Sequence, residues 1–174
     1  MKRLIIGILC ISLILCLFGC RKEAKTSDNK NTVTFYYLRK DVDFGSEHPL
    51  IAPERRTELS SGDTLEYLLA HYMNGPVDDK LYSPFPSGLR VEKIQQENGK
   101  LVITFNTVLT EVTGFLLTQI CACIAMTCTS LTGEETVSIC ALDSNFILQT
   151  VMEFSTSDLF LYDNTPELIN GGSE

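Results

Sequence analysis

Leu89-Arg-Val-Glu-Lys-Ile-Gln-Gln-Glu-Asn-Gly-Lys-Leu-Val-Ile-Thr-Phe105 is the stretch that decides the fold, because it predicts two strands joined by a tight turn. The dipeptide Asn98-Gly99 favours a two-residue hairpin turn in which both φ angles are positive. After this turn Leu101, Ile103 and Phe105 occupy alternate positions, so they share one face of the second strand. We expect that face to meet the helices and to form part of the core.

Helices are predicted on both sides of this hairpin. Upstream, apolar side chains recur at helical spacing over residues 65–73. Asp63, three residues before Glu66, can form a capping box, and Gly75-Pro76 is a typical helix end. Downstream, the sequence predicts a second helix over residues 113–131.

Strands are predicted over residues 33–38 and 136–141, where β-branched and aromatic residues are enriched. The element order is then β-α-β-β-α-β. It predicts the α+β class, as a two-layer unit with two helices packed on one face of a small mixed sheet. Residues 39–60 are expected to be a long polar connection. The domain is expected to span 33–145, and a C-terminal extension, 146–174, to add a strand or hairpin and a frayed tail.

An export signal is predicted at the N-terminus. Lys2-Arg3 supplies a positive start, and residues 4–17 form an apolar run too short to span a bilayer comfortably. The end of that run, Leu17-Phe18-Gly19-Cys20, resembles a bacterial lipobox. We therefore expect removal of residues 1–19 and attachment of fatty acyl chains such as palmitate to Cys20. The alternative is an uncleaved signal anchor.

The mature chain is expected to be acidic and held on the extracytoplasmic face of the cell membrane. Residues 20–32 comprise the lipidated cysteine and a polar tether with a root-mean-square reach of about 20 Å. Cleavage removes Lys2 and Arg3 but no acid, so the formal net charge changes from −8 to −10. Such a charge disfavours nucleic-acid binding, which requires a basic face.

A series of short motifs between about Val33 and Asp143 resembles the GerMN domain of sporulation and spore-germination lipoproteins. The motifs are Leu50-Ile-Ala-Pro-Glu-Arg55, Leu68-Leu69, Gly75-Pro76, Leu81-Tyr-Ser-Pro-Phe-Pro-Ser-Gly88, Val91, Gly99, Val102-Ile-Thr-Phe-Asn106, Leu131-Thr-Gly133 and Val137-Ser-Ile139. The resemblance implies a non-catalytic binding or assembly role outside the membrane. The implied partners are peptidoglycan or the proteins of an envelope or sporulation complex, with self-assembly as a further option.

No catalytic set, cofactor site or metal site is predicted. The two histidines are expected at the surface, and no Ser-His-Asp or Cys-His arrangement has a structural rationale. Cys121 and Cys123 would point about 200° apart on a helix, which disfavours a zinc site. Only Cys140, on the following strand, could form a disulfide with a cysteine of the helix. The favoured interpretation is that these residues and Cys128 are reduced core cysteines.

The second helix has an uncharged reverse face that needs a cover. Residues 112–133 contain no charged side chain, a composition shared with membrane spans, but their many Thr and Ser residues favour a core helix. The reverse face carries Ala122, Ala125, Met126 and Thr129. Either the C-terminal extension covers this face, or the face is an interface with a partner or a second copy.

The favoured function is therefore that of a lipid-anchored envelope protein that acts by protein or peptidoglycan contacts in sporulation or germination. A small-molecule or glycan-binding lipoprotein is the alternative, and it would show a deep pocket lined by aromatic residues. An envelope hydrolase is the third class, and it would show a convergent acid or nucleophile pair in a cleft.

Overall fold

The fold is known from a computed structural model, which describes residues 32–42 and 49–159. The chain divides into two compact units, Met1–Lys30 and Asn31–Glu174, and the described residues belong to the second. In chain order its elements are β1 Val33–Arg39, β2 Ile51–Arg56, α2 Leu65–Met73, β3 Leu81–Tyr82, β4 Val91–Glu97, β5 Lys100–Phe105, the 3-10 helix η2 Thr107–Glu111, α3 Gly114–Thr132, β6 Thr136–Leu142, β7 Leu148–Ser155 and α4 Thr156–Leu159.

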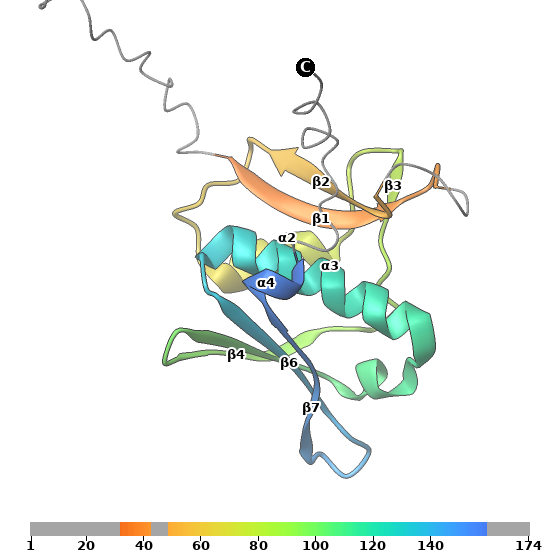
Figure 1. The fold of residues 1–174 in the computed structure, drawn as a ribbon, viewed down its shortest axis with the longest axis vertical. Helices are drawn as coiled ribbons and strands as arrows, with labels where there is room; N and C mark the ends of the chain where they lie inside the picture. The colour runs from red at the N-terminus through yellow and green to blue at the C-terminus, as the bar shows by residue number, and fades with distance from the viewer. Residues whose placement is uncertain (1–31, 43–48, 160–174) are drawn as a thin grey trace, which may run out of the picture. The chain divides into compact units, whose positions relative to one another are not determined.

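The strands form two sheets, with the orders β2-β1-β3 and β4-β5-β6-β7, and α2 and α3 lie between them (Figure 1). The predicted α+β class is confirmed. The expected two-layer arrangement is wrong in one respect, because β1 lies with β2 and β3 in a separate sheet, which adds a third layer. The mixed sheet, in which only β5 and β6 pair in parallel, covers the opposite side of the helices.

Strand β2 is the reason for the additional sheet. It lies inside the predicted polar connection and pairs with β1 in antiparallel register from Val33↔Arg56 to Leu38↔Ile51. Its Pro53 cannot donate a backbone hydrogen bond, which is tolerated because β2 is an edge strand. Its six residues include one proline and three charged residues, so apolar and polar residues do not alternate and the sequence did not predict a strand here.

Helix α2 begins and ends close to the predicted positions, but its cap differs. The N-cap is Thr64, whose hydroxyl accepts a hydrogen bond from the Tyr67 backbone N–H at 3.4 Å. Asp63 instead accepts from the backbone N–H of Ser60 at 2.9 Å, so the predicted capping box does not form. Gly75 follows the helix with a φ of 92°, as expected of a glycine at a helix end.

The hairpin that decides the fold forms as predicted. Strands β4 and β5 pair in antiparallel register, and Asn98 and Gly99 have φ angles of 52° and 75°. Leu101, Ile103 and Phe105 are buried together under the helices. The predicted additional strand is also confirmed: β7 pairs with β6, so residues 148–155 extend the same sheet beyond the expected domain end at 145.

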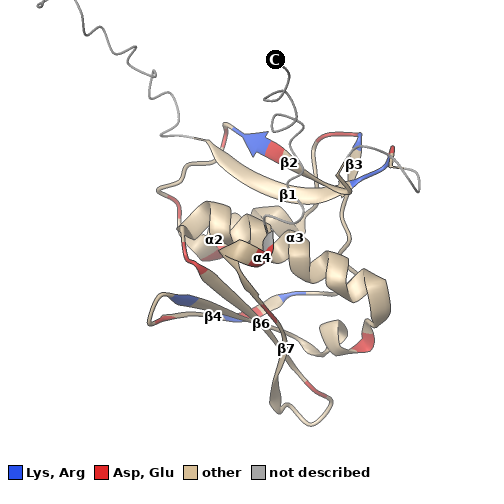
Figure 2. Ribbon diagram, in the orientation of Figure 1, with Lys and Arg blue, Asp and Glu red and all other residues tan. Residues whose placement is uncertain are grey.

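Helix α3 connects the parallel strands β5 and β6 through the middle layer. Among the described residues it is long and apolar enough to cross a membrane by length and composition. Eight of its residues, between Ile120 and Cys128, are buried against the two sheets. This packing agrees with the predicted core helix, and Figure 2 shows the helix without charge along its length.

Candidate functional site

The face of α3 that was predicted as an interface packs inside the chain. Ala122 and Ala125 are 1% and 0% exposed, while Met126 and Thr129 are partly buried. Strand β1 makes the most extensive contact with α3, so the first sheet covers this face. Neither the C-terminal extension nor a partner is needed to explain its lack of charge. The prediction of an interface at Ala122 and Ala125 is therefore wrong.

Hydroxyl groups bind β1 to the helix layer in the part of the strand that β3 does not reach. Strand β3 pairs with only the last two residues of β1. Farther back, the Tyr36 N–H donates to Thr127 Oγ1 at 2.9 Å, and the Tyr72 hydroxyl donates to the Tyr36 carbonyl at 2.8 Å. The Tyr37 hydroxyl donates to the Tyr72 carbonyl at 2.8 Å. Burial raises the pKa of both tyrosines above the ordinary value, so these hydroxyls remain donors.

A buried ion pair holds β2 against the end of α2. Glu54 Oε1 accepts from Arg56 Nε at 2.7 Å, and Glu54 Oε2 accepts from the backbone N–H groups of Val77 and Asp78. The Arg56 guanidinium also donates to the Gly75 carbonyl at 2.7 Å. Because every charged group here has protein partners, this cluster is structural.

Asn106 has a similar positioning role at the end of β5. Its side-chain oxygen accepts from the Arg90 backbone N–H at 3.2 Å, and its amide donates to the Gly88 carbonyl at 2.9 Å. The Asn106 backbone N–H donates to the Arg90 carbonyl at 3.1 Å. These three bonds fix the segment Gly88–Arg90 immediately before β4.

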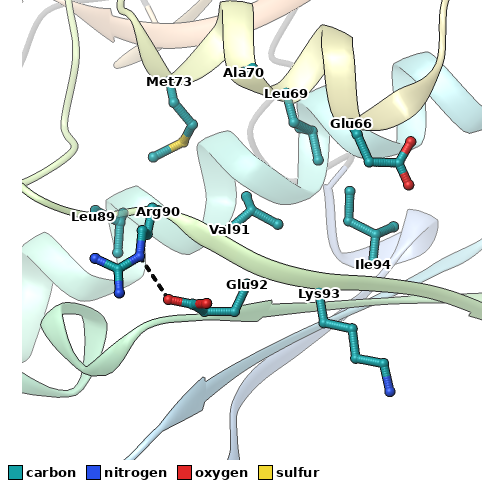
Figure 3. Close-up of a pocket in the computed structure, with 10 residues that line it drawn as sticks. All are labelled: Glu66, Leu69, Ala70, Met73, Leu89, Arg90, Val91, Glu92, Lys93 and Ile94. Carbon is teal, nitrogen blue, oxygen red and sulfur yellow. Dashed lines mark ion pairs between the residues drawn. The ribbon is translucent and has the colours of Figure 1, made fainter.

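That segment forms one end of a groove of about 450 Å³ between α2 and β4. Figure 3 shows Leu69 and Met73 of α2 pointing toward Val91 and Ile94 of β4 across this space. The full lining consists of Glu66, Leu69, Ala70, Met73, Leu89, Arg90, Val91, Glu92, Lys93 and Ile94. The groove therefore has apolar walls and a charged rim.

The position of the groove follows from the sheet order. Strand β4 is an edge strand, and no described strand pairs with its outer side. At the opposite edge, α4 follows β7 and contacts both β7 and α3. Helix α4 therefore packs at the β7 edge of the sheet, whereas the groove lies open at the β4 edge.

The chemistry of the groove suits binding. Arg90 Nε and Glu92 Oε1 form an exposed ion pair at 2.8 Å on the rim. Figure 3 shows Glu66 far from this pair, with its carboxylate pointing away from Glu92. The lining residues include no His, Cys, Ser, Thr or aromatic side chain. They supply neither a nucleophile with a base nor an aromatic surface for a sugar ring.

The cysteines of the described domain are buried thiols. Cys121, Cys123, Cys128 and Cys140 are unbridged, in agreement with the favoured interpretation. Burial raises the pKa of Cys121 to about 12 and raises the pKa of Cys123 and Cys128 further. Thiols with such pKa values are poor nucleophiles and poor metal ligands. The predicted lipidation site, Cys20, lies outside the described residues.

Nothing in the sequence singled out the groove. Its walls come from residues of α2 and β4, and the sequence assigned only Leu69 and Met73 to an apolar face, as part of the stripe of the first helix. One signal was present in the sequence of β4: its apolar residues Val91 and Ile94 are three positions apart, which breaks the alternation of a regular strand. In the structure both side chains point to the helix side, and the strand is irregular between Val91 and Lys93. An irregular edge strand can mark a functional position.

Comparison with known proteins agrees with this fold. The family model described as "Germane: Sporulation and spore germination" matches residues 34–141. Among solved structures, the tandem GerMN domains of the sporulation protein GerM from Bacillus subtilis match with a TM-score of 0.51 and 17% identity. The match covers 77% of this chain and 49% of that structure, so the chain spans about half its length. No curated protein matches. Since the family model covers more than half of its residues, this chain belongs to the Germane family of sporulation and spore-germination domains.

Proposed function

We propose that the protein is a lipid-anchored, non-catalytic envelope protein that acts in sporulation or germination by binding another protein through the α2–β4 groove. The N-terminal residues support the anchor, because Leu17-Phe18-Gly19-Cys20 resembles a lipobox. Family membership supports the process. The groove carries the proposal for the mode of action, because it joins apolar walls to an edge strand.

Protein contact is favoured over the other two classes by the groove's composition. Sugar rings bind well on aromatic faces, and the lining has none. A hydrolase would need a convergent pair of reactive groups, whereas Glu92 is held by Arg90 and Glu66 lies apart from it. An apolar groove beside an edge strand suits a protein segment that adds backbone hydrogen bonds and inserts side chains.

The anchor is tested by the variant Cys20→Ser in the full chain. We expect an unprocessed precursor that no longer incorporates labelled palmitate, because the acceptor thiol is absent. Immunoblotting of membrane and soluble fractions measures processing and location. Normal maturation of this variant would refute the lipoprotein assignment.

The groove is tested in the organism that encodes the chain, by complementing a deletion strain. Ala70→Glu places a charge in the groove at an exposed helix position, so it should leave the fold intact and lower the yield of heat-resistant or germinating spores. Tyr67→Glu is the matched control, because Tyr67 is exposed on the same helix but does not line the groove. If the deletion strain forms and germinates spores normally, the proposed process is wrong.

A further inference from the structure

The end of the β6–β7 hairpin presents three consecutive large apolar side chains to solvent, two in the turn and one at the start of β7. Phe146, Ile147 and Leu148 are 77%, 59% and 54% exposed. Figure 1 shows this hairpin turn at the bottom of the view, beyond the remainder of the second sheet. A contiguous exposed apolar patch of this kind usually marks a contact site.

The turn is held in one conformation. Asp143 Oδ1 accepts from the backbone N–H groups of Asn145 and Ile147, both at 2.8 Å, and Asp143 Oδ2 accepts from the Gln149 side chain. Phe146 has a φ of 59°, which is uncommon for an aromatic residue and has an energetic cost. The chain maintains a strained residue here, and the result is an aromatic ring directed into solvent.

The register of the sheet places this tip level with the groove. Across the sheet, Val91 pairs with Phe105, Phe105 with Ala141, and Ala141 with Gln149. One step farther, the Asn106 N–H bonds to the Arg90 carbonyl while Leu142 pairs with Leu148. Phe146–Leu148 therefore lies level with Leu89 and Arg90, which form the end of the groove.

The two edges of this sheet are also related in direction. Strands β4 and β7 are each antiparallel to their neighbour, and those neighbours, β5 and β6, are parallel to each other. Consequently β4 and β7 run in the same direction. A second copy shifted sideways, without rotation, would bring its β4 beside β7 of the first copy and its groove beside the tip.

We propose that the tip Phe146–Leu148 of one copy inserts into the α2–β4 groove of a second copy. This inference deepens the proposed function, because it rests on the groove as a protein-binding site and names the occupant. The contact is head-to-tail. After two copies join, one still has a free groove and the other a free tip, so assembly continues beyond a dimer.

The charge of the tip and its accessibility both fit its insertion into the groove of a second copy. Residues 143–152 contain one charged side chain, Asp143, while the matching end of the groove exposes Arg90. The tip carries no Lys or Arg, which argues against an anionic lipid surface as its receptor. Helix α4 packs at the other end of β7, where the Thr156 N–H bonds to the Glu135 carbonyl, and so leaves the tip end accessible.

The test uses the full chain, purified from membranes in detergent, with the photo-crosslinker p-benzoylphenylalanine in place of Phe146. Illumination should yield a crosslinked dimer, and mass spectrometry should locate the second attachment within residues 66–73 or 89–94. Adding Ala70→Glu should lower the dimer yield about tenfold, because a charge would be buried in the contact. Tyr67→Glu should leave the yield unchanged.

A mixing experiment separates the two surfaces. A tagged chain with the crosslinker at position 146 and Ala70→Glu has only a working tip, and an untagged chain with Phe146→Asn has only a working groove. Neither should crosslink to itself, whereas the mixture should yield the heterodimer. Absence of a heterodimer, crosslinks to other segments or crosslinks to detergent alone would overturn the proposal. If Ala70→Glu still blocked sporulation in that case, the groove would bind a different protein and the proposed function would stand.

Discussion

At the scale of single residues, the buried ion pair Glu54–Arg56 should be costly to disturb. Both side chains are 7% exposed, and they connect β2 to the residues that follow α2. Glu54→Ala would leave a buried guanidinium without its carboxylate. We expect a loss of about 3–5 kcal/mol in the free energy of unfolding, measured by urea denaturation.

Glu58 provides the control for this prediction. Its carboxylate lies 3.9 Å from Arg56 Nε, but its side chain is 62% exposed. Glu58→Ala should change stability by no more than about 1 kcal/mol, because exposed ion pairs contribute little. Equal effects of the two substitutions would contradict a structural role for Glu54.

Substitution of Phe146, in contrast to that of Glu54, is not expected to lower the stability of the fold. Its side chain is 77% exposed and its φ is positive, so Phe146→Gly removes little buried surface and relieves backbone strain. The variant should be unchanged or up to about 1 kcal/mol more stable in thermal unfolding. A clear loss of stability would show that the ring packs within its own chain, and that result would also weaken the proposed intermolecular contact.

At the scale of elements, α3 should tolerate charge near its first turn but not along its buried middle. Ala122→Glu would bury a carboxylate between α3 and the first sheet, and it should cost several kcal/mol, of the order of 3. Leu116→Glu, at a position 45% exposed on the same helix, should be within about 1 kcal/mol of the parent chain. Circular dichroism during urea denaturation measures both.

This pair of substitutions also tests which element covers the helix. If Ala122→Glu were as well tolerated as Leu116→Glu, the first sheet would not be packed on α3. The face would then be available to a partner, as the sequence had suggested.

At the scale of the whole domain, stability should decline in alkaline solution. Burial raises the pKa of Cys121 from 9.0 to about 12, and it raises the pKa of Cys123 and Cys128 in the same direction. In the unfolded chain these thiols ionise above about pH 9, whereas in the folded chain they stay protonated. Stability is therefore full below about pH 9 and falls as the pH rises toward 12.

The measurement is a set of urea denaturation curves at several pH values between about 8 and 11, because linkage relates the slope to protons bound. Cys121→Ala removes one of the groups and should reduce the dependence on pH. Stability that rises over this interval would contradict the burial of the thiols.

The sequence by itself determined the local elements of this protein. Asn98-Gly99 specified the turn of the β4–β5 hairpin, since few other dipeptides adopt two positive φ angles readily. The apolar stripe of α2 and Gly75 specified where that helix packs and ends. Family membership was also readable from the order of short motifs, and the structure shows that Glu54, Gly75 and Asn106 belong to contacts that hold the fold together.

Only the tertiary structure decided what covers each face. The uncharged face of α3 indicates that the helix needs a cover, but it does not identify β1 as that cover. The contact between them joins residues about 90 positions apart in the chain, as in the bond between Tyr36 and Thr127. The sequence likewise did not predict strand β2, because its pairing with β1 overrides the local effect of Pro53. The groove arises where α2 passes an edge strand and nothing described fills the gap. Local sequence reports that a side chain is apolar, whereas long-range packing decides whether it lies in the core or lines a binding site.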